Sequence, residues 1–222
     1  MPPNPKRGVF ILMEGVDRCG KTTQVDLLSK SEMFSPSKKM NFPDRTTTIG
    51  TMINSYLKSQ TEMSDESVHL LFSSNRWECN NDILQTLNSG VNIVCDRYAY
   101  SGVAFTHSKP NAPDLSWCRG PDVGLVRPDA ILFLSVDAET AEGRGGFGDE
   151  RYENSTHQNA VRGVFKTLKE MDEETGEGRW FDINAKGTVE EVKGRIENVV
   201  KEVMEDVGPI KKLWSDGVYG GD

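Results

Sequence analysis

One eight-residue segment constrains this chain more than any other part of it. The segment reads Gly15-Val16-Asp17-Arg18-Cys19-Gly20-Lys21-Thr22 and matches G-x-x-x-x-G-K-[ST] at each fixed position. An apolar run over residues 9–13 precedes it, and an amphipathic stretch from residue 20 to about residue 33 follows it. A strand, a glycine-rich turn and a helix in this order predict a loop whose backbone N–H groups and helix N-terminus bind one phosphate. A chance match in a glycine-rich turn is the alternative, and the flanking pattern argues against it.

The residue types inside this loop indicate a nucleoside triphosphate such as ATP. We expect Lys21 to reach the β- and γ-phosphates and the hydroxyl of Thr22 to bind Mg²⁺. Cys19 lies near Lys21 and a helix N-terminus, a setting that can make a thiol reactive, although a small residue that only fills space is the simpler interpretation. The expected ATP-binding residues of the loop are Gly15, Val16, Asp17, Arg18, Cys19, Gly20, Lys21, Thr22 and Thr23.

Apolar runs alternate with longer amphipathic stretches along the whole chain, which is typical of βα units around a parallel sheet. Strands are predicted at residues 9–13, 40–42, 91–95, 130–136 and 180–183. Helices are predicted at residues 20 to about 33, 49–57, 64–87, 154–172 and 189–207, the third broken near Asn80. The prediction is a doubly wound α/β fold, a five-stranded parallel sheet flanked by helices, in one domain over residues 1–222.

Two segments fall outside this regular pattern. Residues 143–148 hold a cluster of glycines between the fourth strand and the next helix, and such a cluster suits a mobile flap better than a packed element. We therefore predict a lid over about residues 143–153. The last residues, 215–222, are expected to form a flexible extension.

Composition and charge exclude several classes of protein. The 222 residues carry a formal net charge of −8, all of it after residue 100, because the first hundred residues hold 11 basic and 11 acidic side chains. An acidic chain without a basic tract is a poor candidate for binding long nucleic acid. No apolar run approaches the roughly 20 residues that span a bilayer. The polar start lacks a signal-peptide core, so a cytoplasmic location is expected, with a nuclear or mitochondrial pool left open.

A second apolar strand ends in a carboxylate. Residues 93–96 read Ile-Val-Cys-Asp, so Asp96 is expected to face the metal or its water shell beside the phosphate loop. Alternatively, Asp96 caps a helix that begins near Tyr98. No N-K-x-D guanine signature occurs, which argues against a GTPase. A kinase for a small molecule fits better, and it requires a second site for an anionic acceptor.

Four further segments make the family recognisable. They are Phe42-Pro43-Asp44-Arg45, Ser74-Asn75-Arg76-Trp77-Glu78, the run from Asp96-Arg97-Tyr98 to Phe105, and Arg144 to Glu153. They resemble, in order, the signature segments and the lid of eukaryotic-type thymidylate kinases. The resemblance runs from about residue 8 to residue 214. It implies a P-loop kinase architecture, ATP as the phosphoryl donor, Mg²⁺ as the cofactor, dTMP as the acceptor and a homodimer.

The resemblance also implies which residues bind dTMP. Phe72 would stack on the thymine and Arg76 would read its exocyclic oxygen; the alternative is that Phe72 belongs to the core and Arg76 to a surface ion pair. Arg45 and Arg97 would bind the phosphate, since the planar guanidinium suits a dianion. Asp17 would accept a hydrogen bond from the sugar 3′-hydroxyl. The remaining expected contacts are Phe42, Ser101, Phe105, Tyr152 and Gln158.

Phosphoryl transfer needs positive charge near the transferring group. The expected catalytic residues are Arg18, Lys21, Asp96 and Arg97, with Arg18 assigned to the chemistry and Arg144 to holding ATP. Residues 184–187 are expected near the adenine, although an ordinary turn explains them nearly as well. Two alternatives remain, another P-loop deoxynucleoside or nucleoside monophosphate kinase and a regulatory module that only binds ATP. Two arginines for an acceptor phosphate argue against a nucleoside acceptor.

Overall fold

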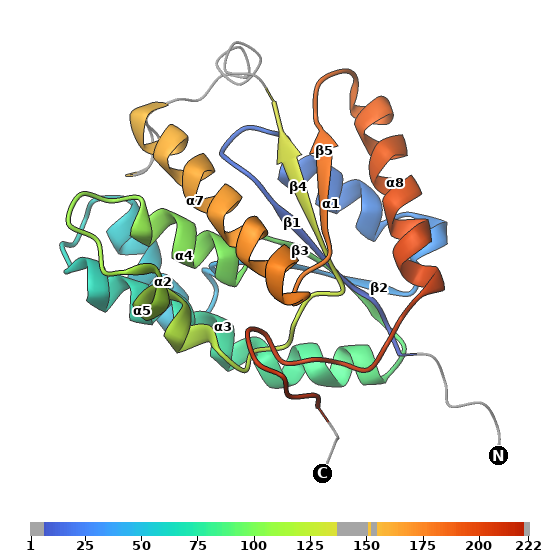
Figure 1. Cartoon of the computed structure of the whole chain (residues 1–222), viewed down its shortest axis with the longest axis horizontal. Helices are drawn as coiled ribbons and strands as arrows, with labels where there is room; N and C mark the ends of the chain where they lie inside the picture. The colour runs from blue at the N-terminus through green and yellow to red at the C-terminus, as the bar shows by residue number, and fades with distance from the viewer. Residues whose placement is uncertain (1–6, 137–150, 152–154, 220–222) are drawn as a thin grey trace.

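The computed structural model describes residues 7–136, 151 and 155–219, and a five-stranded sheet lies at its centre. The strands are β1 (Phe10–Glu14), β2 (Ser37–Asn41), β3 (Asn92–Asp96), β4 (Ala130–Ser135) and β5 (Trp180–Asn184). All pairs are parallel, in the order β2-β3-β1-β4-β5 (Figure 1). The predicted α/β architecture is confirmed. No helix of the described residues is long and apolar enough to cross a membrane.

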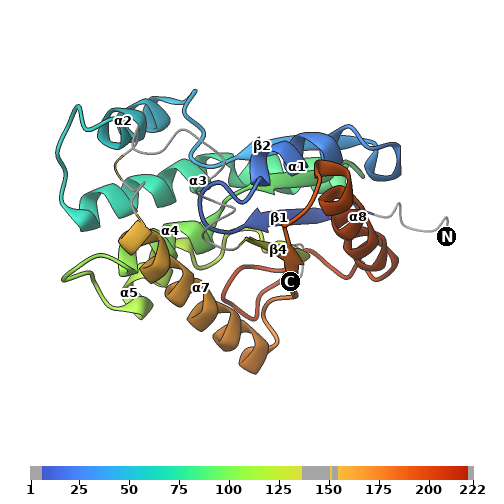
Figure 2. The same cartoon turned by 90° about the horizontal axis from the view of Figure 1, so that it is seen from above.

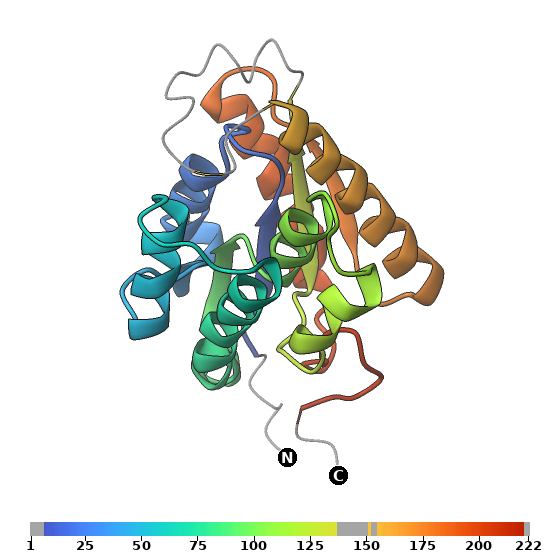
Figure 3. The ribbon, with the colours of Figure 1, turned by 90° about the vertical axis from the view of Figure 1, so that its left-hand side faces the viewer.

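Alternating side chains of β1 divide the core into two layers. Phe10 and Leu12 pack into one cluster, and Ile11 and Met13 pack into the other, as the two-residue repeat of a strand requires. Helices α1 (Lys21–Ser29) and α8 (Val189–Glu205) cover the second face (Figure 2). Helices α3 (Asp65–Asn88), α4 (Ala99–His107) and α7 (Ser155–Thr175) cover the first and lie side by side across it (Figure 3).

Two predicted boundaries are wrong for physical reasons. Helix α1 ends at Ser29 instead of about residue 33, because a 3-10 turn, η1 (Glu32–Phe34), inserts the buried Phe34 into the core. Strand β2 begins at Ser37 instead of residue 40. It is an edge strand, so its lysines reach solvent, where Lys38 pairs with Asp82 at 2.5 Å.

Helix α3 is continuous where we predicted a break near Asn80. Asn80 is 5% exposed, and both the oxygen and the nitrogen of its side chain form tertiary contacts. Its Oδ1 accepts a hydrogen bond from the backbone N–H of Val126 at 2.8 Å, and its Nδ2 donates to the Tyr219 hydroxyl at 3.0 Å. A polar residue with such partners does not compete with the helix for backbone hydrogen bonds.

The segment after residue 214 is also not a free extension within its described part. The hydroxyl of Tyr219 donates to the carbonyl of Gly124 at 2.5 Å, and the backbone of Val218 forms a bridge with Lys211. Helices α2 (Thr48–Leu57) and α5 (Leu115–Arg119) are the other helices of the described residues, and a 3-10 turn at residues 120–122 follows α5. The sequence pattern predicted α2, gave a helix from near Tyr98 only as an alternative role for Asp96, and did not predict α5.

Candidate active site

The two sequence motifs meet at the carboxyl end of the sheet. Strand β1 lies between β3 and β4, so the loop after β1 and the turn after β3 emerge beside each other. The N–H of Arg97 donates to the carbonyl of Met13 at 3.1 Å, which ties the two loops together. The strands that follow β1 in the chain lie on both of its sides, so the strand order switches direction at β1. Open α/β sheets bind ligands beside such a switch point.

The phosphate loop wraps around the buried amino group of Lys21. The Nζ atom donates to the carbonyl of Val16 at 2.8 Å and to that of Gly15 at 3.1 Å. Gly15 has a φ of 143°, and a Cβ there would lie 2.4 Å from the carbonyl oxygen of Leu134. A side chain is therefore excluded at this point of the turn. The side chains of Val16 and Cys19 are buried beneath the loop.

A groove lies along this loop, and we name it the phosphate groove. Most residues predicted to bind ATP line it, together with residues of β2. They are Asp17, Arg18, Gly20, Lys21, Thr22, Thr23, Val25, Lys39, Met40, Asn41, Phe42, Pro43, Arg45, Asp96 and Arg97.

The polar atoms at the floor of this groove suit a hard cation. The Thr22 hydroxyl donates to Oδ2 of Asp96 at 2.6 Å. Oδ1 of Asp96 is buried and has no hydrogen-bond partner among the described residues. Those residues include no group of three or more His, Cys, Asp or Glu side chains that could hold a metal alone. A hydroxyl and one carboxylate fit Mg²⁺, which is usually held by few protein oxygens together with phosphates and water.

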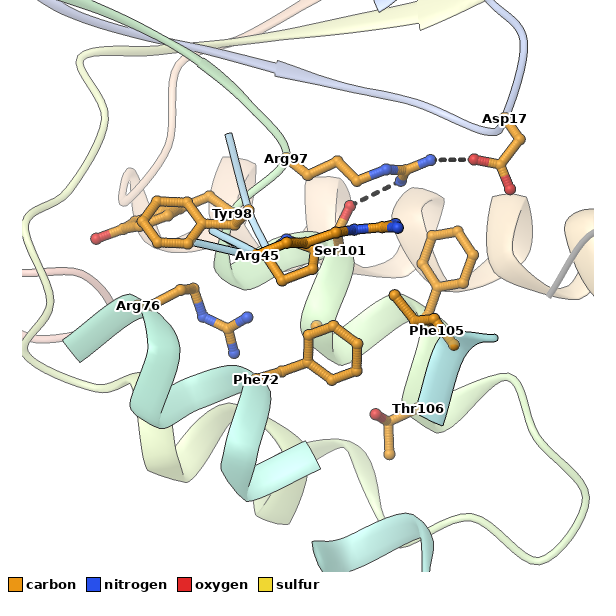
Figure 4. Close-up of a pocket in the computed structure, with 13 residues that line it drawn as sticks. Asp17, Arg45, Phe72, Arg76, Arg97, Tyr98, Ser101, Phe105 and Thr106 are labelled. Atoms are coloured by element: carbon orange, nitrogen blue, oxygen red, sulfur yellow. Dashed lines mark hydrogen bonds and ion pairs between the residues drawn. The ribbon is translucent and has the colours of Figure 1, made fainter. Parts of the chain in front are cut away.

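A second groove opens beside the first, between α3 and α4, and we name it the acceptor groove. Its empty space measures about 730 Å³ including the mouth, enough for a small ligand. Figure 4 shows Phe72 and Arg76 of α3 facing Ser101 and Phe105 of α4 across this space. It is lined by Asp17, Phe42, Pro43, Arg45, Leu57, Phe72, Arg76, Arg97, Tyr98, Ser101, Gly102, Phe105 and Thr106.

Arg97 stands where the two grooves meet. Its guanidinium pairs with Asp17, donates to the Ser101 hydroxyl at 3.0 Å and lies 4.9 Å from the centre of the Phe105 ring (Figure 4). Gln158 donates to the other oxygen of Asp17 at 2.6 Å. Burial opposes the charge on Asp17, but Arg97 and Lys21 hold the pKa of this carboxyl below its usual range. The site therefore keeps Asp17 ionised.

Glu14 is a site residue that the sequence analysis missed. It is completely buried at the end of β1. Its Oε1 accepts hydrogen bonds from the N–H groups of Tyr98 and Ser101, and its Oε2 accepts from the Ser101 hydroxyl at 2.6 Å. Burial raises the pKa of Glu14, with Arg97 opposing it. An apolar strand that ends in a carboxylate was its available signal, the same signal that identified Asp96.

Arg76 combines features of both sequence interpretations. It lines the acceptor groove, as the resemblance implies. It also forms an ion pair, as the alternative implies, but a buried one, with Nη2 of Arg76 2.6 Å from Oδ2 of Asp122. Nothing in the sequence around Asp122 indicated this contact, which joins positions 46 residues apart.

The remaining predictions concern residues outside the two grooves or outside the described part of the chain. Arg144 and Tyr152 lie outside the described residues, as does most of the predicted lid. Arg151 stacks 4.2 Å from the centre of the Tyr56 ring and pairs with Glu62 at 2.7 Å. The segment at residues 184–187 follows β5, and Arg195 donates to the carbonyl of Lys186 at 2.7 Å.

Comparisons with known proteins agree closely with one another. Residues 13–196 match the family model described as thymidylate kinase. Thymidylate kinases from Danio rerio and Homo sapiens are 44% and 41% identical to the chain; each alignment covers 94% of this chain and 98% of the relative. A solved thymidylate kinase structure from Candida albicans, described as having broad substrate specificity, superposes with a TM-score of 0.84. It is 37% identical, over 93% of this chain and 98% of that one.

Proposed function

Since the chain belongs to the thymidylate kinase family, whose members phosphorylate dTMP with ATP, we propose that the transfer takes place where the phosphate groove and the acceptor groove meet. The observation that carries this proposal is the position of Arg97. It lines both grooves and is paired with Asp17 of the phosphate loop. A single guanidinium can thus contact an acceptor phosphate beside the donor site.

On the donor side, the loop binds the triphosphate of ATP. Lys21 and the loop N–H groups hold the phosphate oxygens, and Arg18 neutralises charge on the transferring group. Thr22 and Asp96 would hold Mg²⁺, which would supply further positive charge to the reacting phosphates. An acceptor phosphate is already a nucleophile near neutral pH, so the site requires no strong general base.

On the acceptor side, the groove offers a separate contact for each part of dTMP. Arg45 and Arg97 bind the phosphate with planar, charge-assisted hydrogen bonds. Asp17 accepts from the sugar hydroxyl, and Phe42 lies beside the sugar. Phe72 stacks on the base, and Arg76 donates to its exocyclic oxygen. Ser101, Phe105 and Gln158 complete the site around Arg97 and Asp17.

Calorimetric titration tests the phosphate contact without turnover. Wild type should bind dTMP much more tightly than thymidine. Arg45→Ala should weaken dTMP binding by about tenfold, the loss of roughly one charge-assisted hydrogen bond, and leave thymidine binding unchanged. Arg179→Ala, which removes an arginine that pairs with Glu202 of α8 and with Asp206 just after it, is the control. Equal affinities of wild type for dTMP and thymidine would refute the proposed position of the phosphate.

We also propose that the chain forms a homodimer through the face made by α3, α5 and the turn η2 (Gly120–Asp122). Four large apolar side chains are exposed there, namely Leu70 (46%), Trp77 (40%), Trp117 (36%) and Val123 (44%). Leu70 and Trp77 are two helical turns apart, so they share one side of α3. Several large apolar side chains exposed on neighbouring elements favour a protein contact.

Sedimentation velocity tests the dimer. Leu70→Glu should shift wild-type dimers to monomers, because a charge would be buried in the interface. Val189→Glu changes an equally exposed apolar residue on α8 and should leave the mass unchanged. If Leu70→Glu still sediments as a dimer, the interface lies elsewhere. If the wild type sediments as a monomer, the homodimer proposal is refuted.

A further inference from the structure

Asp122 is a buried carboxylate behind the acceptor groove, and it does not line that groove. It has no exposed surface, and Arg76 is 1% exposed. Nε of Arg76 donates to Oδ1 of Asp122 at 3.0 Å, and Nη2 donates to Oδ2 at 2.6 Å. The Ser73 hydroxyl donates to the same Oδ1 at 2.8 Å. Both carboxylate oxygens are thus engaged, and the pair has the two-pronged geometry that gives arginine its directional specificity.

The opposite side of the guanidinium is closed by the backbone of α4. A Cβ at Gly102 would lie 2.7 Å from Nη2 of Arg76 and 3.0 Å from Nη1. Real Cβ atoms are essentially never found at the first of these distances, so a side chain at position 102 would force the guanidinium to shift from the place where it meets Asp122. Arg76 is therefore held between a carboxylate and a glycine.

This arrangement leaves one part of Arg76 for a ligand. A guanidinium has five N–H donors and no acceptor, and Asp122 uses the Nε edge. The remaining N–H groups are next to Phe72 in the groove (Figure 4). Because Asp122 neutralises the guanidinium, Arg76 is suited to a neutral carbonyl oxygen and is kept from competing for the acceptor phosphate.

Resting on the proposed function, in which Arg76 meets the base, we propose that Asp122, together with Gly102, is a positioning element that makes the enzyme select pyrimidines with an exocyclic oxygen over those with an amino group. An oxygen accepts the N–H groups that point into the groove. An amino group there presents a donor to a donor and leaves buried polar groups unpaired, which is costly. A guanidinium that cannot move away enforces this difference.

The experiment compares kcat/KM for dTMP and dCMP in four proteins. They are wild type, Asp122→Asn, Gly102→Ala and the double variant. The wild-type preference for dTMP should fall by about tenfold or more in each single variant, which is the scale on which a hydrogen-bonding site rejects a mismatched group. In the double variant the two effects should be less than additive, because the added methyl no longer presses on an anchored guanidinium.

Controls separate positioning from folding. Asp129→Asn breaks another two-pronged pair, with Arg7, at the opposite end of β1, and should leave the dTMP preference unchanged. Thermal melting is measured for every variant. If Asp122→Asn does not fold, Gly102→Ala still tests the positioning role, since this variant keeps both members of the Arg76–Asp122 ion pair.

Two outcomes overturn different claims. An unchanged preference in both Asp122→Asn and Gly102→Ala, with Arg76→Ala losing it, would remove the positioning role and keep Arg76 as the base contact. An unchanged preference in Arg76→Ala would instead contradict the proposed base contact itself, on which the inference depends.

Discussion

Replacing Asp17 by asparagine tests the junction between the two grooves. The substitution keeps the shape of the side chain and removes its charge. Asp17 is paired with Arg97 and accepts from Gln158, so the variant loses one charge-assisted contact and loosens the guanidinium that we place against the acceptor phosphate. A hydrogen bond to a charged group contributes about 1.5–3 kcal/mol. Because the two side chains are 19% and 29% exposed, the lower part of that range applies.

A loss of about 1.5–2 kcal/mol corresponds to roughly a 10- to 30-fold fall in kcat/KM for dTMP. Initial rates from a coupled ADP-release assay at saturating ATP measure it. Asp182→Asn, which breaks the surface pair with Lys169, is the matched control and should behave as wild type. An Asp17→Asn enzyme with unchanged kcat/KM for dTMP would refute the reasoning that Asp17 and Arg97 act together on the acceptor.

Three other substitutions follow from the contacts. Phe72→Ala should raise KM for dTMP by about 5- to 150-fold, since base stacking contributes about 1–3 kcal/mol; an unchanged KM in steady-state kinetics would exclude stacking. Tyr219→Phe removes the hydroxyl shared with Asn80 and Gly124 and should lower the free energy of unfolding by about 1–2 kcal/mol in urea titrations; no loss would mean that this segment contributes nothing. Burial raises the pKa of Asp172 above its ordinary 3.8, so the native state binds a proton that the unfolded state has lost, and the free energy of unfolding falls as pH rises from 3.8 through the folded pKa. Asp172→Asn should abolish this pH dependence in urea titrations. A dependence that persists in the variant would come from another group.

The sequence predicted the sheet and the phosphate loop well because both are local patterns. Short runs rich in apolar residues, three to seven residues long, gave all five strands, and the spacing of Gly15, Gly20 and Lys21 gave the loop. The continuity of α3 through Asn80 was not predictable in this way. Its amide is satisfied by residues far along the chain, and no local pattern encodes such partners.

The acceptor site shows the same limit at finer detail. The resemblance to a family led to Phe72, Arg76 and Arg97, and the structure brings them into one groove. The resemblance assigned no role to Asp122 or to Gly102, since a lone aspartate in a turn and a glycine in a helix have no pattern of their own. Their roles depend on where the Arg76 guanidinium lies, which only the packed structure defines.

The most direct test of the central claim is a coupled ADP-release assay with ATP and Mg²⁺ that compares dTMP, dUMP, dCMP, AMP and thymidine as acceptors. Rapid turnover of dTMP, slower turnover of dUMP and none of thymidine would agree with an acceptor phosphate bound beside Arg97 at the meeting point of the two grooves. Turnover of thymidine without turnover of dTMP would contradict the account, because the acceptor groove would then hold a nucleoside and its arginines would have no phosphate to bind.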